Sequence, residues 1–193
     1  MSLAIDTDTF EIKGIDVQVE YFDDPDMDPP WENDDGRGKV RKTNSRHRDG
    51  DSDKRPGERP LNQPDRHAYQ FHYDWKEATQ RARKDGWNTE PYDAPCRVQR
   101  AVEADFQFIR AYLRQDWEYV GIVVKILDDD GAVIAEDSCL GFETHKDYHK
   151  ESAKEMAEAL VDSYFEQQEE ELAADIKEAA ERLFWEERDV VTV

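Results

Sequence analysis

Apolar side chains alternate along residues 119–127 with the two-residue period of a β-strand, and they occupy both of its faces. A strand that is apolar on both faces needs cover on both sides, so we place this strand at the centre of the fold. The Asp-Asp-Gly that follows favours a tight turn, because Asp and Gly tolerate a positive φ, and residues 132–140 return antiparallel. The pattern predicts a central β-hairpin over about residues 117–140.

Two earlier stretches show the same period. Residues 9–22 carry apolar side chains at mostly alternate positions, with a slip at Gly14 that indicates a bulge or a turn. Residues 69–73 place three aromatic side chains at alternate positions, as in a half-buried strand. We therefore expect an N-terminal strand or hairpin and a further strand before the central hairpin.

Helical patterns begin directly after the aromatic strand. Asp74 is a suitable N-cap, Glu77 stands three residues later as in a capping box, and Gly86 is suited to end this helix. Apolar residues at spacings of three and four then predict a second helix over about residues 95–115.

A third helical pattern follows the hairpin, from about residue 147 to about residue 187. It is interrupted at residues 167–171, which are Gln and Glu only. At 1.5 Å per residue an unbroken helix of this length would span about 60 Å. We therefore expect two helices, or one helix that bends near the interruption.

Residues 23–64 lack such periods and are rich in Asp, Gly, Pro and Arg. A segment of this composition buries too little apolar surface to offset the entropy lost on ordering, so we expect a long mobile loop. The organisation predicted is an N-terminal strand or hairpin in residues 1–22, this charged loop, and a core in residues 65–193, all in a single domain. Strands that cluster with helices, rather than strictly alternating, predict an α+β fold with a small, mainly antiparallel sheet.

The net charge of −21 is unevenly distributed along the chain. Residues 1–36 carry 12 acids and one base, residues 37–100 carry 10 acids and 16 bases, and residues 101–193 carry 25 acids and nine bases. Such a chain repels nucleic acid and anionic membranes and attracts basic proteins. We expect the basic middle to fold back on the acidic blocks or to keep the loop solvated. Without an apolar run that could cross a membrane or a signal-like N-terminus, and with two cysteines, the chain is expected in the cytoplasm.

The predicted C-terminal helix is the candidate site. Glu158, Asp162 and Glu166 are spaced four residues apart, so their carboxylates share a face at intervals of about 6 Å. We expect no Lys or Arg to pair with them along this row. A row of carboxylates at this pitch is comparable with the charges along a DNA backbone, which predicts a DNA-mimicking surface. The alternative is a solvated helix face. The full set of predicted partner-binding acids is Glu158, Asp162, Glu166, Glu169, Glu170 and Asp175.

Other residue types give weaker signals. His145 and His149 are four residues apart, as in a two-histidine metal site, but only Cys139 or Glu143 could complete it, so we predict no metal. No nucleophile motif is present, and we predict no catalytic residue, no cofactor and no enzymatic activity. Trp31 and Trp185 lie in polar or terminal surroundings and are candidate interface aromatics.

Four segments together resemble a family of small proteins encoded by tailed bacteriophages. They are KRPGERPL at Lys54–Leu61, the aromatic strand before Lys-Glu-Ala, RKDGW at Arg83–Trp87, and DWEYVGIVVKILDDDG at Asp116–Gly131. The resemblance covers roughly residues 54–165 and departs from the family pattern at Ser138–Gly141, where a Trp is expected. It implies a phage origin and the cytoplasm of the host cell, and it implies no mechanism.

These observations lead to one hypothesis and two alternatives. The first is a non-enzymatic phage protein that binds a basic or DNA-binding host protein, as an acidic DNA mimic that inhibits a nucleic-acid-handling defence factor. It would bind neither nucleic acid nor membranes directly. The alternatives are a structural module that forms a homo-oligomer, in which the acids serve solubility, and an unrecognised metal-dependent enzyme.

Overall fold

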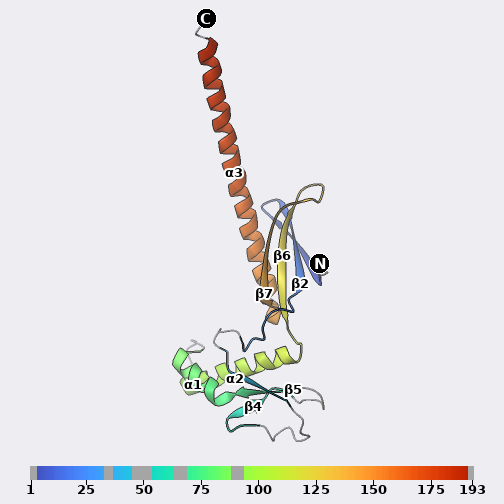
Figure 1. Ribbon diagram of the computed structural model, residues 1–193, viewed down its shortest axis with the longest axis vertical. Coiled ribbons are helices and arrows are strands. Elements are labelled where there is room, and N and C mark those ends of the chain that lie inside the picture. Colours follow the sequence, from blue (N-terminus) through green and yellow to red (C-terminus); the bar gives the residue numbers. More distant parts are fainter. Residues whose placement is uncertain (1–3, 33–36, 45–53, 63–68, 88–93, 191–193) are drawn as a thin grey trace. The chain divides into compact units, whose positions relative to one another are not determined.

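The computed structural model describes residues 4–32, 37–44, 54–62, 69–87 and 94–190, with the side chains of 44, 94, 95 and 183–190 left aside (Figure 1). The chain divides into two compact units, where a single domain was predicted. Unit 1 consists of residues 1–25 and 119–193, and unit 2 consists of residues 26–118. Both units combine antiparallel strands with helices, which confirms the predicted α+β class. None of the helices described has the length and apolar content that a membrane crossing requires.

Unit 1 contains a four-stranded sheet in the order β1-β2-β6-β7, with every neighbouring pair antiparallel. The four strands are β1 (Asp6–Ile12), β2 (Ile15–Asp23), β6 (Tyr119–Leu127) and β7 (Val133–Glu143). Lys13 and Gly14, with φ of 53° and 81°, form the tight turn between β1 and β2, which explains the slip in the apolar pattern. The N-terminal and central hairpins are both confirmed.

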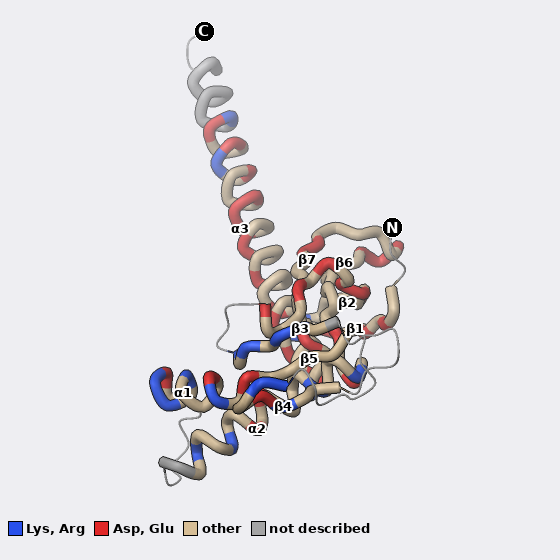
Figure 2. The backbone as a smooth tube through the Cα atoms, turned by 60° about the horizontal axis from the view of Figure 1, so that its bottom comes forward, with Lys and Arg blue, Asp and Glu red and all other residues tan. Residues whose placement is uncertain are grey.

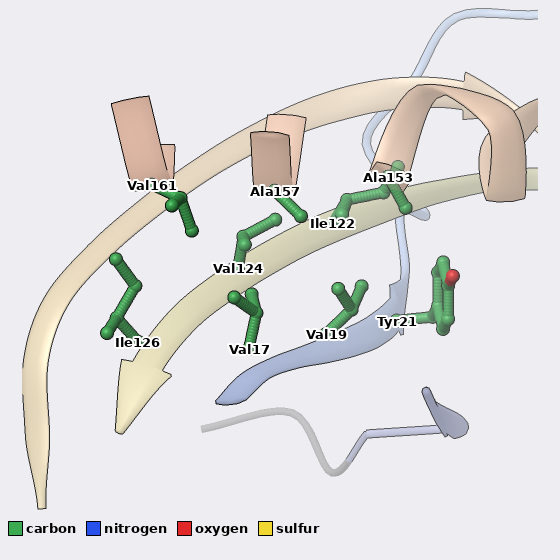
Figure 3. Close-up of a cluster of buried hydrophobic side chains, with 9 residues drawn as sticks. All are labelled: Val17, Val19, Tyr21, Ile122, Val124, Ile126, Ala153, Ala157 and Val161. Atoms are coloured by element: carbon green, nitrogen blue, oxygen red, sulfur yellow. The ribbon is translucent and has the colours of Figure 1, made fainter. Parts of the chain in front are cut away.

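The core of unit 1 lies between this sheet and the first turns of helix α3 (Tyr148–Val190). Alternate residues of β2 and β6 point toward the helix, which meets them with small side chains four residues apart (Figure 3). The buried set is Val17, Val19, Tyr21, Ile122, Val124, Ile126, Ala153, Ala157 and Val161. Val123 and Leu127 point to the other face of the sheet and are half-buried, so within this unit a helix covers one face of the central strand.

Helix α3 is one continuous helix of 43 residues, preceded by a 3-10 turn at His145–Asp147. The prediction of two helices or a bend near residues 167–171 is therefore wrong. The interruption at 167–171 removes apolar contacts but not helix propensity, because Gln, Glu, Ala, Leu and Lys are all good helix formers. With no Gly or Pro to end it, the helix continues beyond the sheet of its own unit (Figure 1).

Unit 2 contains a three-stranded antiparallel sheet in the order β3-β5-β4 and two helices. Its elements are β3 (Val40–Asn44), β4 (Glu58–Pro60), β5 (Tyr69–Asp74), α1 (Trp75–Asp85) and α2 (Ala94–Leu113). The Asp74 carboxylate caps α1 by accepting from the Glu77 N–H at 2.9 Å, and Gly86 ends the helix with a φ of 67°. Both predicted helix boundaries of α1 are thus confirmed.

Strands β3 and β4 lie within residues 23–64, where the sequence predicts a loop. Each strand pairs with β5 through its backbone, and a charged pair also links β3 with β4. The Arg41 guanidinium on β3 donates to both carboxylate oxygens of Glu58 on β4, at 2.9 and 2.7 Å. The low apolar content of this stretch predicts a loop, because apolar content takes no account of ion pairs. Residues 33–36, 45–53 and 63–64 of the predicted loop are outside the part that the structure describes.

Candidate partner-binding surface

Helix α3 has two parts with different surroundings. Up to Tyr164, one of its faces is packed on the sheet. From residue 165 to residue 182 every side chain is exposed except the half-buried Ala179. We call residues 165–182 the distal segment of α3. Within the described part of unit 1, side chains on all sides of this segment are exposed to solvent.

The structure brings five of the six predicted acids onto one side of α3. At 3.6 residues per turn, Glu158, Asp162, Glu166, Glu169 and Glu170 fall within about a third of the helix circumference. All five are exposed. Asp175 lies on the opposite side of the helix, so it does not belong to this acidic face. We use the name acidic face for the five residues that share it.

Two of these acids have basic partners, so the expectation of none was wrong. Lys13, in the β1–β2 turn, places its Nζ 2.6 Å from Oδ1 of Asp162, and the Nζ of Lys154 lies 3.8 Å from Oε1 of Glu158. Lys154 stands four residues before Glu158 on the same row and could have been found from the spacing. Lys13 could not, because its contact depends on where the N-terminal hairpin lies. All four side chains are more than half exposed, so these pairs stabilise the fold little.

The net charge of the chain belongs almost entirely to unit 1. This unit has 28 acids and eight bases, a net of −20, while unit 2 has 19 acids and 18 bases, a net of −1. In Figure 2 acidic positions follow α3 and the strands of unit 1, whereas Lys and Arg are concentrated on the elements of unit 2. The acidic face is therefore part of a unit in which acids outnumber bases by more than three to one.

Several basic residues of unit 2 pair with acids of the same unit. Arg41 pairs with Glu58, the NH1 of Arg37 lies 3.6 Å from Oδ1 of Asp105, and Lys39 approaches Glu77. The exposed Arg59 pairs with Glu103 and stacks on Trp75 with its Cζ 3.4 Å from the ring centroid. These contacts give the four basic residues named here a structural role within unit 2.

Glu58 and Asp105 are buried carboxylates that the sequence analysis missed. Asp105 accepts from the Gly38 N–H at 2.8 Å and from the Tyr73 hydroxyl at 2.7 Å. Burial, together with Asp105, raises the pKa of that hydroxyl. Asp105 stands three residues after one buried position of α2 and four before another, so the helical spacing could have placed it on the buried face.

An open pocket of about 460 Å³ lies in unit 2, lined by Arg59, Trp75, Cys96, Gln99, Arg100 and Glu103. Its Arg59 guanidinium is held between the Trp75 ring and the Glu103 carboxylate. Its described lining pairs Cys96 with no histidine, the usual base for a thiol nucleophile. The described lining therefore contains no recognisable catalytic pair.

The two candidate metal-binding histidines have different surroundings. His145 lies in the 3-10 turn, and His149 is buried, with its ring edge-on to Tyr21 at 5.3 Å between centroids. Burial is the main cause that lowers the pKa of His149. Within the described residues no three His, Cys, Asp or Glu side chains are grouped so as to hold a metal ion.

Of the candidate interface aromatics, the structure describes the side chain of Trp31 and not that of Trp185. Trp31 is half-buried, with its ring 5.4 Å from Phe71 and 5.8 Å from Tyr112 between centroids. These contacts explain Trp31 through packing inside unit 2. A role for either residue in an interface stays a prediction.

Comparison with known proteins gives no match among family models, curated proteins or solved structures. The resemblance to a family of phage proteins stays a prediction as well.

Proposed function

We propose that this chain is a non-enzymatic binding protein whose helix α3 engages a positively charged surface of another protein. One observation carries the proposal. The acidic face continues from the sheet-packed part of α3 onto a distal segment whose side chains are exposed, in a unit with a net charge of −20. A body of one sign attracts a basic partner from a distance and orients it on approach.

The arrangement of the carboxylates supports a partner that otherwise holds nucleic acid. Glu158, Asp162 and Glu166 repeat about every 6 Å along the axis, and Glu169 and Glu170 extend the same side. A basic groove built for phosphates recognises a regular row of anions on a narrow rod. In this proposal the five carboxylates act as phosphate surrogates. Asp175, on the other side of the helix, has no part in it.

The origin of the chain would define the partner. If the resemblance to phage proteins holds, the partner is a host protein that handles nucleic acid, such as a defence factor, in the host cytoplasm. The proposed protein binds neither nucleic acid nor membranes itself, because its unit 1 repels both.

Two variants with the same change of net charge test the proposal. In the α3-neutral variant the five acids of the acidic face become Gln or Asn. In the control variant five exposed acids of the unit 1 sheet and its turns are replaced in the same way: Glu11, Asp16, Asp129, Asp130 and Glu136. Both keep side-chain size, and Gln keeps helix propensity.

Each protein is immobilised and exposed to a bacterial lysate at low salt. The proposal predicts that the wild type and the control variant capture the same basic protein, that the α3-neutral variant does not, and that added duplex DNA releases it. Capture that is equal for the two variants, or a captured protein that DNA does not displace, would contradict the proposed mimicry.

A second candidate function, homo-oligomerisation, is favoured by a different observation. Phe165, Leu172 and Ile176 in the distal segment are exposed, with 37%, 61% and 61% of their surface accessible. Apolar side chains in such positions on a long helix are typical of a contact with another helix. Light scattering on the purified chain distinguishes the two candidate functions, because only homo-oligomerisation predicts a stable oligomer without any other protein.

A further inference from the structure

Four apolar residues of the distal segment and one Glu form a regular seam. Phe165, Glu169, Leu172, Ile176 and Ala179 are separated by four, three, four and three residues. This is the spacing at which a helix presents one continuous edge to a second helix in a coiled coil. We call these five residues the α3 seam. It lies beside the acidic face, and Glu169 belongs to both.

The seam is unlike the surface of a helix that remains in solvent. Leu172 and Ile176 are each 61% exposed, although Gln, Glu or Lys at these positions would be equally good helix formers. Packing of an apolar edge is the main source of stability for helices in proteins. The sheet-packed part of α3 obtains this stability from β2 and β6, and the distal segment has no such support within the described part of unit 1.

The charges of the segment decide between the two kinds of helix that could cover the seam. Residues 165–182 contain seven acids and two bases. In a homodimer, two distal segments with a net charge of −5 each would face one another. The second copy would also bring at least one further Glu169 into a seam from which water is excluded, where a charge without a partner is costly. A helix with Lys or Arg at the facing position gives Glu169 a partner, and basic flanks complement the rest of the segment.

We therefore propose that the α3 seam binds an amphipathic helix of another protein, which has an apolar stripe, basic flanks and a Lys or Arg opposite Glu169. This inference rests on the proposed function, in that both place a basic partner on α3. It adds that recognition includes burial of Leu172 and Ile176, and it names the secondary structure of the partner element.

The test uses the full chain and a designed probe. The probe is a three-heptad peptide with Leu at the seam positions, Lys and Arg on the flanks, and Lys opposite Glu169. Two double variants are compared: Leu172→Gln with Ile176→Gln on the seam, and Gln167→Ala with Ala174→Gln on the opposite side of the helix. Circular dichroism checks that both keep the helical signal.

The expected result is a loss of peptide affinity of at least tenfold for the seam variant and less than about twofold for the opposite-side variant. Glu169→Lys weakens binding of the same peptide, and a peptide with Glu in place of the facing Lys restores it. Equal affinity of the two double variants overturns the inference. A dimer of the chain alone that the seam variant loses also overturns it, because the second copy would then be the occupant.

The inference and the proposed function fail separately. If the α3-neutral variant loses the captured partner while the seam variant retains it, binding is electrostatic and the seam is not used. If the seam binds the probe but no basic protein is captured through the acidic face, the helix-binding inference stands and the DNA-mimic function falls.

Discussion

Two buried carboxylates, Glu58 and Asp105, explain why a stretch of the chain with little apolar content has a defined structure. Each carboxylate forms an ion pair with an Arg guanidinium of unit 2 and accepts a hydrogen bond from a backbone N–H of the same unit. Arg41 is the largest cause that lowers the pKa of Glu58, to about 2. The folded state therefore binds a proton at Glu58 less readily than the unfolded chain does.

Arg41→Gln removes this partner. We expect the free energy of unfolding of unit 2 to fall by about 2 kcal/mol, the range for a hydrogen bond to a charged group. The contribution of Glu58 is fully present above its ordinary pKa of 4.5 and is lost as the pH falls toward 2, so acid unfolding of the variant should begin at a higher pH. Urea titrations over this range measure both effects.

Lys39→Gln is the control, because the Lys39 Nζ is 3.6 Å from Glu77 and its side chain is 72% exposed. It should change stability by less than about 1 kcal/mol. Equal effects of the two substitutions would show that the Arg41–Glu58 pair between the two edge strands does not stabilise unit 2.

Gly38 is required for a steric reason. A Cβ at this position would lie 2.5 Å from the Tyr73 ring, which is fully buried and held by its hydrogen bond to Asp105. Gly38→Ala should therefore destabilise unit 2 by about 1–3 kcal/mol, as overpacking of a core does.

Gly121→Ala provides the comparison. Its Cβ would meet the Leu140 side chain at 2.6 Å, but Leu140 is 70% exposed and can move aside. Thermal unfolding should separate the two substitutions clearly, and a Gly38→Ala protein as stable as Gly121→Ala would be inconsistent with the close packing of Gly38 on Tyr73.

His149 predicts a pH dependence for unit 1. Burial and Lys150 lower its pKa, against the opposing effect of Asp147, Asp6 and Asp8. The unfolded chain then binds more protons just below pH 6.5, so unit 1 should lose stability as the pH falls through this region.

His149→Phe keeps an aromatic ring against Tyr21 and should remove this dependence below pH 6.5. His145→Gln should retain it. A wild-type unfolding free energy that does not change with pH in this window would contradict the assignment.

At the scale of elements, most of the fold can be predicted because its signals are local. The two hairpins follow from alternation and turn residues, and α1 follows from Asp74 and Gly86. Strand β3 could not be predicted in this way, because its stability depends on Glu58, 17 residues away from Arg41. The length of α3 was misjudged since helix propensity, and not contact with the sheet, decides where this helix ends.

The candidate site was predictable to the same extent. The spacing alone places Glu158, Asp162 and Glu166 on one row, and it also places Asp175 on the other side of the helix. The contact between Lys13 and Asp162 joins residues 149 apart in the sequence, and no local pattern indicates it.

The two parts of α3 predict different effects on folding. A chain that ends after Gln167 keeps the residues that pack on the sheet, Ala153, Ala157 and Val161. Its unit 1 should unfold within about 1 kcal/mol of the wild type, because an exposed helical segment adds little stability without tertiary packing. The measurement is urea unfolding followed by far-ultraviolet circular dichroism. A large loss of stability would mean that the distal segment supports the fold.

At the scale of the whole molecule, the main feature is the unequal distribution of charge between the two units. Unit 2 is nearly neutral and several of its bases, among them Arg37 and Arg41, pair with acids, whereas unit 1 has a net charge of −20. If the acids served only solubility, their effect would depend on their number and not on their positions. Recognition by α3 does depend on their positions, and the α3-neutral and control variants lose the same charge at different places.

The salt dependence of affinity for the captured partner tests this claim most directly. We expect the dissociation constant of the wild type and of the control variant to rise steeply between about 0.05 M and about 0.5 M salt, as contacts between exposed charges become screened. The α3-neutral variant should bind weakly at low salt and show a much shallower slope. Affinity that is insensitive to salt, or equal slopes for the two variants, would contradict the account.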